Sequence, residues 1–176
     1  MRNIMPAAIG FLGLIVMSVT PTLAADPVRI AFVDTGNTGR SVTSEALARQ
    51  IIAEKHLNVQ VISRAFDFNP YNIEPEPNAA ILLKQHGIDV SAHRAEQLTV
   101  QDIRHSSLIL TATAKHKAGV IDAFPEAAAK TFTMSEYVTG TTADVVDAYG
   151  KPMDVYEQVF SQINGYIAPI LEKASR

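Results

Sequence analysis

The 176-residue chain has no cysteine, and aromatic residues make up only 7% of it. Without cysteine it can form no disulfide, carry no lipid-anchored cysteine and present no thiolate nucleophile. Low-complexity tracts and internal repeats are also lacking, which argues against a disordered chain and against a solenoid. A formal net charge of -3 leaves no excess of positive charge. Nonspecific nucleic-acid binding needs a basic face, so we expect no nucleic-acid partner.

The longest apolar run lies at the N-terminus. Arg2 supplies a positive start, residues 4–19 are mostly apolar and uncharged, and small residues around Ala24 suit cleavage before Asp26. A membrane anchor is the alternative, but the run is short and ends in Thr-Pro-Thr. We therefore expect a signal peptide over residues 1–25, a mature domain over residues 26–176, and a periplasmic or secreted protein with no membrane contact after cleavage.

The remaining chain alternates between two kinds of apolar pattern. Short β-branched runs predict strands at residues 28–33, 59–62, 108–111 and 131–133. Helical patterns predict helices from residue 41, over 78–86, from 99, over 115–124 and over 154–173, with polar loop residues over 139–152. This alternation predicts an α/β fold, a doubly wound four-stranded parallel sheet flanked by helices. Ligands of such sheets bind beyond the carboxyl ends of strands, so the turn after the first strand is the natural site.

That turn has the parts of an anion cradle. Gly36 and Gly39 permit tight curvature, and successive backbone N–H groups before a helix offer partial positive charge. Arg40 adds a planar fork that matches phosphate oxygens. On these residues alone, an ordinary strand-to-helix turn with Ser41 as the helix cap is an equally good interpretation.

The wider chain favours the cradle. Residues Val33 to Ser41 resemble the Cys-x5-Arg-Ser loop of the low-molecular-weight tyrosine phosphatase and arsenate reductase family, but Asp34 replaces the nucleophilic cysteine and Gly39 a second cysteine. The protein-arginine phosphatase branch looks nearest, because it carries threonine after the nucleophile, as Thr35 does here. The resemblance continues, in order, over residues 87–95, 97–99, 116–117, 130–133, 136–140 and 144–150.

The resemblance implies a protein phosphatase site that uses no cofactor and no metal. Its ligand would be a phosphorylated protein or a small phosphate or other oxyanion. Asp34 would stand at the position of the nucleophile, Arg40 would clamp the phosphoryl oxygens, and Asp147 would be the general acid. Tyr149 would line the substrate entrance. The phosphate-binding loop would comprise Thr35, Gly36, Asn37, Thr38, Gly39, Arg40 and Ser41, and Ser63 and His93 would join Asn37 and Ser41 in a buried network that supports it.

Asp34 alters this chemistry. A carboxylate is a weaker nucleophile than a thiolate in the same place, and the N–H groups that attract phosphate also attract the carboxylate. We expect Asp34 to be hydrogen-bonded to its own loop or to Arg40 and to repel an incoming phosphate. The sequence thus predicts an exported pseudophosphatase with weak or no phosphatase activity, which binds an oxyanion, another ligand or a protein partner.

Two alternatives stay open. Asp34 could serve as nucleophile or base, with Asp147 as general acid, in an active phosphomonoesterase. A version of this chemistry similar to that of haloacid dehalogenases would need Mg²⁺, for which Asp144 and Asp147 are candidate ligands. In the other alternative, a site filled by Asp34 prefers a cation or a neutral molecule over phosphate and turns nothing over.

Overall fold

The computed structural model describes residues 26–176, so the expected signal peptide lies outside the described residues. Four strands form one parallel sheet in the order β2-β1-β3-β4. They are β1 (Val28–Asp34), β2 (Val59–Ala65), β3 (Leu108–Thr111) and β4 (Thr131–Thr133). The predicted doubly wound parallel sheet is confirmed. Among the helices of this part of the chain, none combines the length and apolar character needed to cross a membrane.

Strand β1 is the centre of the molecule. It pairs with β2 from Val28 to Asp34 and with β3 from Ile30 to Val33. Since the chain leaves β1 for one neighbour and later returns to the other, the switch point lies at the carboxyl end of β1. The turn that begins at Asp34 therefore opens into the crevice where ligands of such sheets bind.

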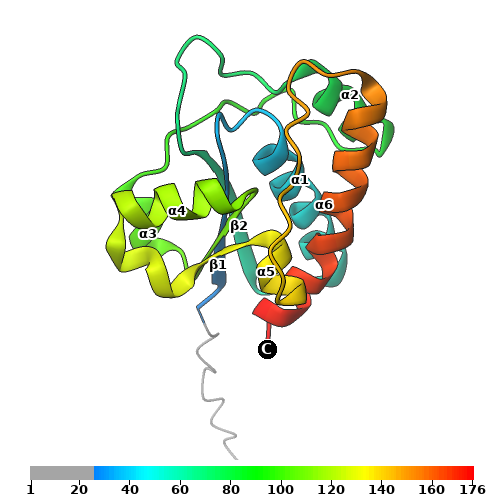
Figure 1. Ribbon diagram of the computed structural model, residues 1–176. Coiled ribbons are helices and arrows are strands. Elements are labelled where there is room, and N and C mark those ends of the chain that lie inside the picture. Colours follow the sequence, from blue (N-terminus) through cyan, green and yellow to red (C-terminus); the bar gives the residue numbers. More distant parts are fainter. Residues whose placement is uncertain (1–25) are drawn as a thin grey trace, which may run out of the picture.

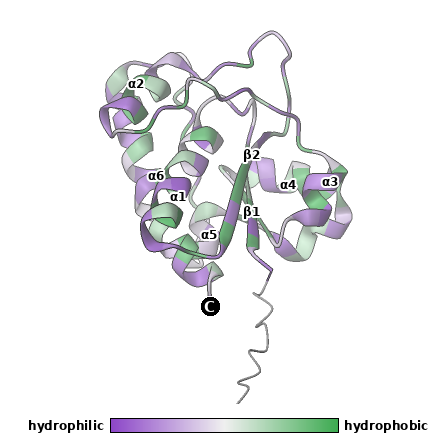
Figure 2. Cartoon of the chain, turned by 180° about the vertical axis from the view of Figure 1, so that it is seen from behind, coloured by the Kyte–Doolittle hydropathy of each residue, from purple (hydrophilic) through white to green (hydrophobic). Residues whose placement is uncertain are grey.

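Helices cover both faces of the sheet (Figure 1). One layer holds α1 (Arg40–Lys55), α2 (Pro77–Gln85), α5 (Met134–Thr139) and α6 (Met153–Ala174), and the other holds α3 (Val100–His105), α4 (Ala114–Ala123) and the 3-10 helix η1 (Pro125–Lys130). Because strand side chains alternate, Ile30 and Phe32 pack in the core below α1 and α6, whereas Ala31 and Val33 pack against the α3 and α4 side. Seen from behind, β1 and β2 are largely apolar and lie between the two helical layers (Figure 2).

Two local predictions needed correction. Helix α5 was not predicted, because six residues are too few to show a helical period. Its capping box, in which Thr133 and Glu136 exchange hydrogen bonds, is the sequence signal that could have revealed it. Helix α1 begins at Arg40, and its N-cap Gly39 supplies no side-chain bond, so Ser41 is not the cap. The carboxylate of Asp34 takes over part of that role.

Candidate functional site

The buried carboxylate of Asp34 sits inside the loop that follows β1. Its Oδ1 accepts a hydrogen bond from the backbone N–H of Asn37 at 2.6 Å, and its Oδ2 accepts one from Ser41 N–H at 2.9 Å. The side chain is almost fully buried, with 3% of the residue exposed. The expectation that Asp34 bonds to its own loop is confirmed. Two N–H groups that face the inside of the loop are thus already satisfied by a negative group.

Asn37 organises the loop around this carboxylate. Its backbone adopts the left-handed conformation, with φ of 56°, which asparagine tolerates better than most residues. Its side chain donates to Ser41 Oγ at 3.0 Å and accepts from Glu96 N–H at 3.0 Å. The Nε2 of His93 lies 2.9 Å from the Asn37 carbonyl oxygen. The structure therefore brings Asn37, Ser41 and His93 together around the loop.

Ser63 lies outside this network. Its hydroxyl donates to Glu45 of α1, and Glu45 also pairs with Arg49 at 2.6 Å. The expected contact of Ser63 with the loop is not seen, since the Ser63 hydroxyl reaches a carboxylate of α1 instead. Ser63 thus links β2 to α1, and the loop is supported from the other side by His93 and Glu96.

The guanidinium of Arg40 is engaged by the loop that precedes α6. Its Nη2 lies 3.1 Å from Asp147 Oδ2, and its Nη1 donates to the Val145 carbonyl at 3.2 Å. Arg40 is buried, whereas the Asp147 side chain is 58% exposed. The other Asp147 oxygen accepts from Tyr149 N–H at 3.1 Å. The predicted phosphate clamp and the predicted general acid are therefore neighbours, joined as an ion pair.

Tyr149 and Asp144 belong to the same loop before α6, but they lie at different places in the site. Tyr149 is 60% exposed at the edge of the cavity, where its hydroxyl accepts from Asn72 Nδ2 at 3.4 Å. Asp144 accepts from Ala114 N–H at 2.8 Å, so it holds the start of α4. Across residues 26–176, no group of three or more His, Cys, Asp or Glu side chains is arranged to hold a metal ion.

His116 is a site residue whose role the sequence did not reveal. Its Nε2 lies 2.8 Å from Thr35 Oγ1 in the loop, and its Nδ1 lies 3.0 Å from Thr113 Oγ1. Burial lowers the pKa of His116, and the positive charge of Arg40 lowers it further, while nearby aspartates oppose both. Thr113 caps α4, and its side chain accepts from the N–H of His116, three residues later. This capping spacing is a local sequence signal that relates His116 to Thr113.

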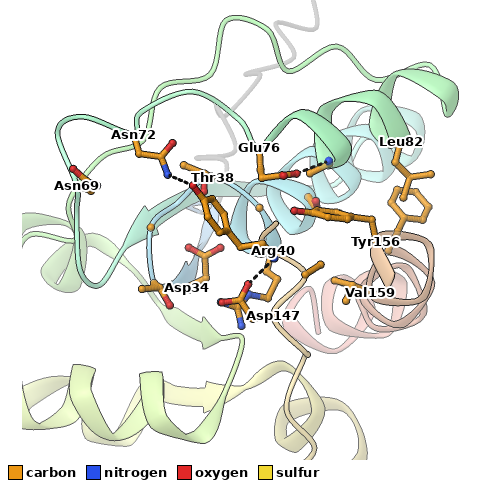
Figure 3. Close-up of a pocket in the computed structure, with 18 of the residues that line it drawn as sticks. Asp34, Thr38, Arg40, Asn69, Asn72, Glu76, Leu82, Asp147, Tyr156 and Val159 are labelled. Carbon is orange, nitrogen blue, oxygen red and sulfur yellow. Dashed lines mark hydrogen bonds and ion pairs between the residues drawn. The ribbon is translucent and has the colours of Figure 1, made fainter. Parts of the chain in front are cut away.

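A cavity of about 380 Å³ extends from the loop toward α2 and α6 (Figure 3). Its inner wall is apolar and consists of Ala79, Leu82, Val159 and Phe160. The polar part of its lining includes four carboxylates, those of Asp34, Asp67, Glu76 and Asp147, and one cationic side chain, that of Arg40. A volume of this size is typical of small-molecule sites, which range over about 300–1,000 Å³.

Comparisons with known proteins agree on one family. A family model described as low molecular weight phosphotyrosine protein phosphatase matches residues 29–175. The chain is 36% identical over 147 residues to a protein-arginine-phosphatase of Geobacillus stearothermophilus. The aligned region covers 84% of this chain and 96% of the relative. It is 32% identical over 136 residues to the low molecular weight protein-tyrosine-phosphatase PtpB of Staphylococcus haemolyticus. That alignment covers 77% of this chain and 92% of the relative.

Solved structures lead to the same group. The YwlE arginine phosphatase from Geobacillus stearothermophilus superposes with a TM-score of 0.77 at 36% identity, covering 84% of this chain and 92% of that one. A cysteine-to-serine mutant of YwlE with a phosphorylated active-site serine gives a TM-score of 0.79 at 32% identity, covering 83% and 95%. The similarity thus spans nearly all of the described residues.

Proposed function

This chain belongs to the low molecular weight phosphotyrosine protein phosphatase family, and we propose that it is a pseudophosphatase of that family. In this proposal the phosphate loop keeps its shape but has weak or no phosphatase activity. The protein binds a ligand or a protein partner without turnover. Its relatives include a protein-arginine-phosphatase and a protein-tyrosine-phosphatase, so the inherited substrate would be a phosphorylated protein.

The observation that carries the proposal is the pair of hydrogen bonds to Asp34. Its carboxylate accepts from Asn37 N–H in the loop and from Ser41 N–H in the first turn of α1. A phosphoryl group bound in the loop would have to compete for these donors and approach a negative charge. At about 4 Å and an effective dielectric near 20, each pair of like unit charges costs roughly 4 kcal/mol. That repulsion offsets much of the attraction that the loop supplies.

A comparison of three proteins tests the proposal. Turnover of an aryl phosphate and of a phosphoarginine peptide is measured for the native chain, Asp34→Ala and Asp34→Cys. We expect the native chain and Asp34→Ala to be inactive or nearly so, and Asp34→Cys to gain activity, because a thiolate in this loop is a strong nucleophile. Native turnover at the rate of Asp34→Cys would contradict the proposal.

One observation favours a second candidate, an active phosphomonoesterase. Asp34, Arg40 and Asp147 line the same cavity, so a nucleophile or base, a clamp and a general acid are together. The YwlE mutant carries a phosphorylated active-site serine, so a side-chain oxygen can hold a phosphoryl group in a related active site. This candidate predicts a phosphoenzyme at Asp34. Acid-quenched mass spectrometry after incubation with an aryl phosphate would detect it in the native chain and not in Asp34→Ala.

A further inference from the structure

The cavity beside the loop has a charge that does not suit an anion. Its four carboxylates exceed the single guanidinium of Arg40 by three charges, and that guanidinium is already paired with Asp147. A cleft lined by one sign of charge concentrates ligands of the opposite sign. The charge alone therefore favours a cation, but a cluster of acidic residues needs a second indication before it counts as a site.

Tyr156 supplies that second indication. The residue is 5% exposed and lines the cavity, yet no group among residues 26–176 lies at normal hydrogen-bond distance and angle from its hydroxyl, although the Glu76 carboxylate is near. Its ring reaches from α6 toward Glu76 at the start of the facing α2 (Figure 3). Burial, with the nearby Glu76 carboxylate, raises the pKa of Tyr156, so the hydroxyl keeps its proton. Buried polar groups without a partner are rare and call for an explanation such as a ligand.

Glu76 is placed to act with this hydroxyl. Its Oε2 accepts from Asn78 N–H at 2.9 Å and from Ala79 N–H at 3.2 Å, which fixes the side chain at the N-terminus of α2. A carboxylate has about four acceptor positions, so Glu76 keeps capacity for a ligand donor. The tyrosine oxygen is also an acceptor when its own proton faces Glu76. A protonated amine can satisfy both groups at once.

Apolar side chains beside Tyr156 select the rest of the ligand. Leu82, Val159 and Phe160 offer an apolar wall next to Tyr156. We infer that this cavity binds an organic cation, a primary amine on an aromatic or branched apolar body, with the ammonium group at Glu76 and Tyr156 and the body against that wall. The inference names a ligand class for the site of the proposed function. It rests on that proposal in one respect, because the Asp34 carboxylate must exclude phosphate from the loop.

Three probes of similar shape test the inference. Binding of 2-phenylethylamine, 2-phenylethanol and phenylacetate to the purified protein is measured by calorimetry at pH 7. We expect the amine to bind about tenfold or more tightly than the neutral alcohol, as a hydrogen bond to a charged group implies, and phenylacetate to bind least. No amine binding, or equal binding of amine and alcohol, would overturn the inference.

Amine binding to substituted proteins tests whether the ammonium group lies at Glu76 and Tyr156. Glu76→Gln keeps an acceptor for the α2 cap but removes the charge, so it should abolish the preference of amine over alcohol. Tyr156→Phe keeps the ring and should weaken amine binding several-fold. Glu157→Gln removes an exposed charge from the same helix and serves as the control, with amine binding unchanged. Amine binding that survives Glu76→Gln undiminished would also overturn the inference.

Phosphatase turnover, measured on the same samples, separates the two ideas. If the native protein hydrolyses phosphate esters rapidly, the proposed function fails, whatever the amine does. If turnover is absent and the amine does not bind, the proposed function stands and only the cation site is lost.

Discussion

A single side chain, that of Asp34, sets the hydrogen bonding inside the loop. Asp34 brings its own negative charge to donors that would otherwise face an anion. It also replaces part of the cap that α1 lacks, since Gly39 has no side chain to offer. The carboxylate therefore plays a structural part as well as an electrostatic one, and its removal should have opposite effects on stability and on anion binding.

Asp34→Ala tests both effects. We expect the variant to lose about 1–2 kcal/mol of unfolding free energy, because two N–H groups lose their acceptor. We also expect it to bind inorganic phosphate at least about tenfold more tightly than the native chain, by removal of the repulsion. Chemical denaturation and calorimetry measure the two quantities. Asp122→Ala, which removes an exposed carboxylate of α4, makes the same change in net charge and should change neither.

We expect His116 to make the stability of the protein depend on pH. Its pKa is lowered in the folded state from the ordinary value of 6.5, chiefly by burial and then by Arg40. The unfolded chain thus binds the proton more readily between these two pKa values. The contribution of neutral His116 is fully present above pH 6.5 and is lost as the pH falls toward the lowered value.

We therefore expect His116→Gln to reduce the loss of unfolding free energy between pH 7.5 and pH 5.5, with urea denaturation as the measurement. The exposed His105 provides the control, and His105→Gln should retain the native pH dependence. An unchanged pH dependence in His116→Gln would show that other groups carry the effect. Loss of the Thr35 contact is a separate cost that is present at both pH values.

At the scale of elements, α6 contributes six buried side chains to the domain and also forms one wall of the cavity. Ile163 and Ile167 are completely buried on the side that faces α1, while Val159 and Phe160 line the cavity one turn earlier. The same helix therefore links the stability of the domain to the shape of the site.

Ile163→Ala should lower the unfolding free energy by about 2–5 kcal/mol, because a large side chain is removed from a closely packed core. Ser161→Ala, on the exposed side of α6, should change it by less than about 0.5 kcal/mol. Urea denaturation of the two variants makes the comparison. Similar values for both would mean that α6 is not packed as described.

At the scale of the whole molecule, we propose that the chain is exported, with residues 1–25 removed. The basis is the sequence of those residues, which ends in small side chains before Asp26. The proposal is consistent with a site that has no thiol to oxidise, since the chain has no cysteine.

Mass spectrometry of the protein recovered from its own cells tests export. We expect a periplasmic or extracellular product that begins near Asp26, and retention of the full chain when Leu14→Glu interrupts the apolar run. Recovery of the intact 176-residue chain from the cytosol would contradict export. The fold and the site do not depend on the outcome.

Much of this protein followed from sequence alone. The parallel sheet, most helices, the family and the position of the loop are carried by local periodicity and by motifs in a fixed order, which short segments encode by themselves. The six-residue helix α5 escaped because its only signal was a cap.

The tertiary structure decided which partners the polar side chains take. Arg40 pairs with Asp147, Ser63 with Glu45 and Thr35 with His116. The buried hydroxyl of Tyr156 faces Glu76 and has no partner at normal hydrogen-bond distance and angle within residues 26–176. These pairings join residues that are from 18 to 107 positions apart, or face one another across two helices, so no local pattern contains them. Packing of distant elements sets the charge and shape of the cavity, and with them the ligand that it can hold.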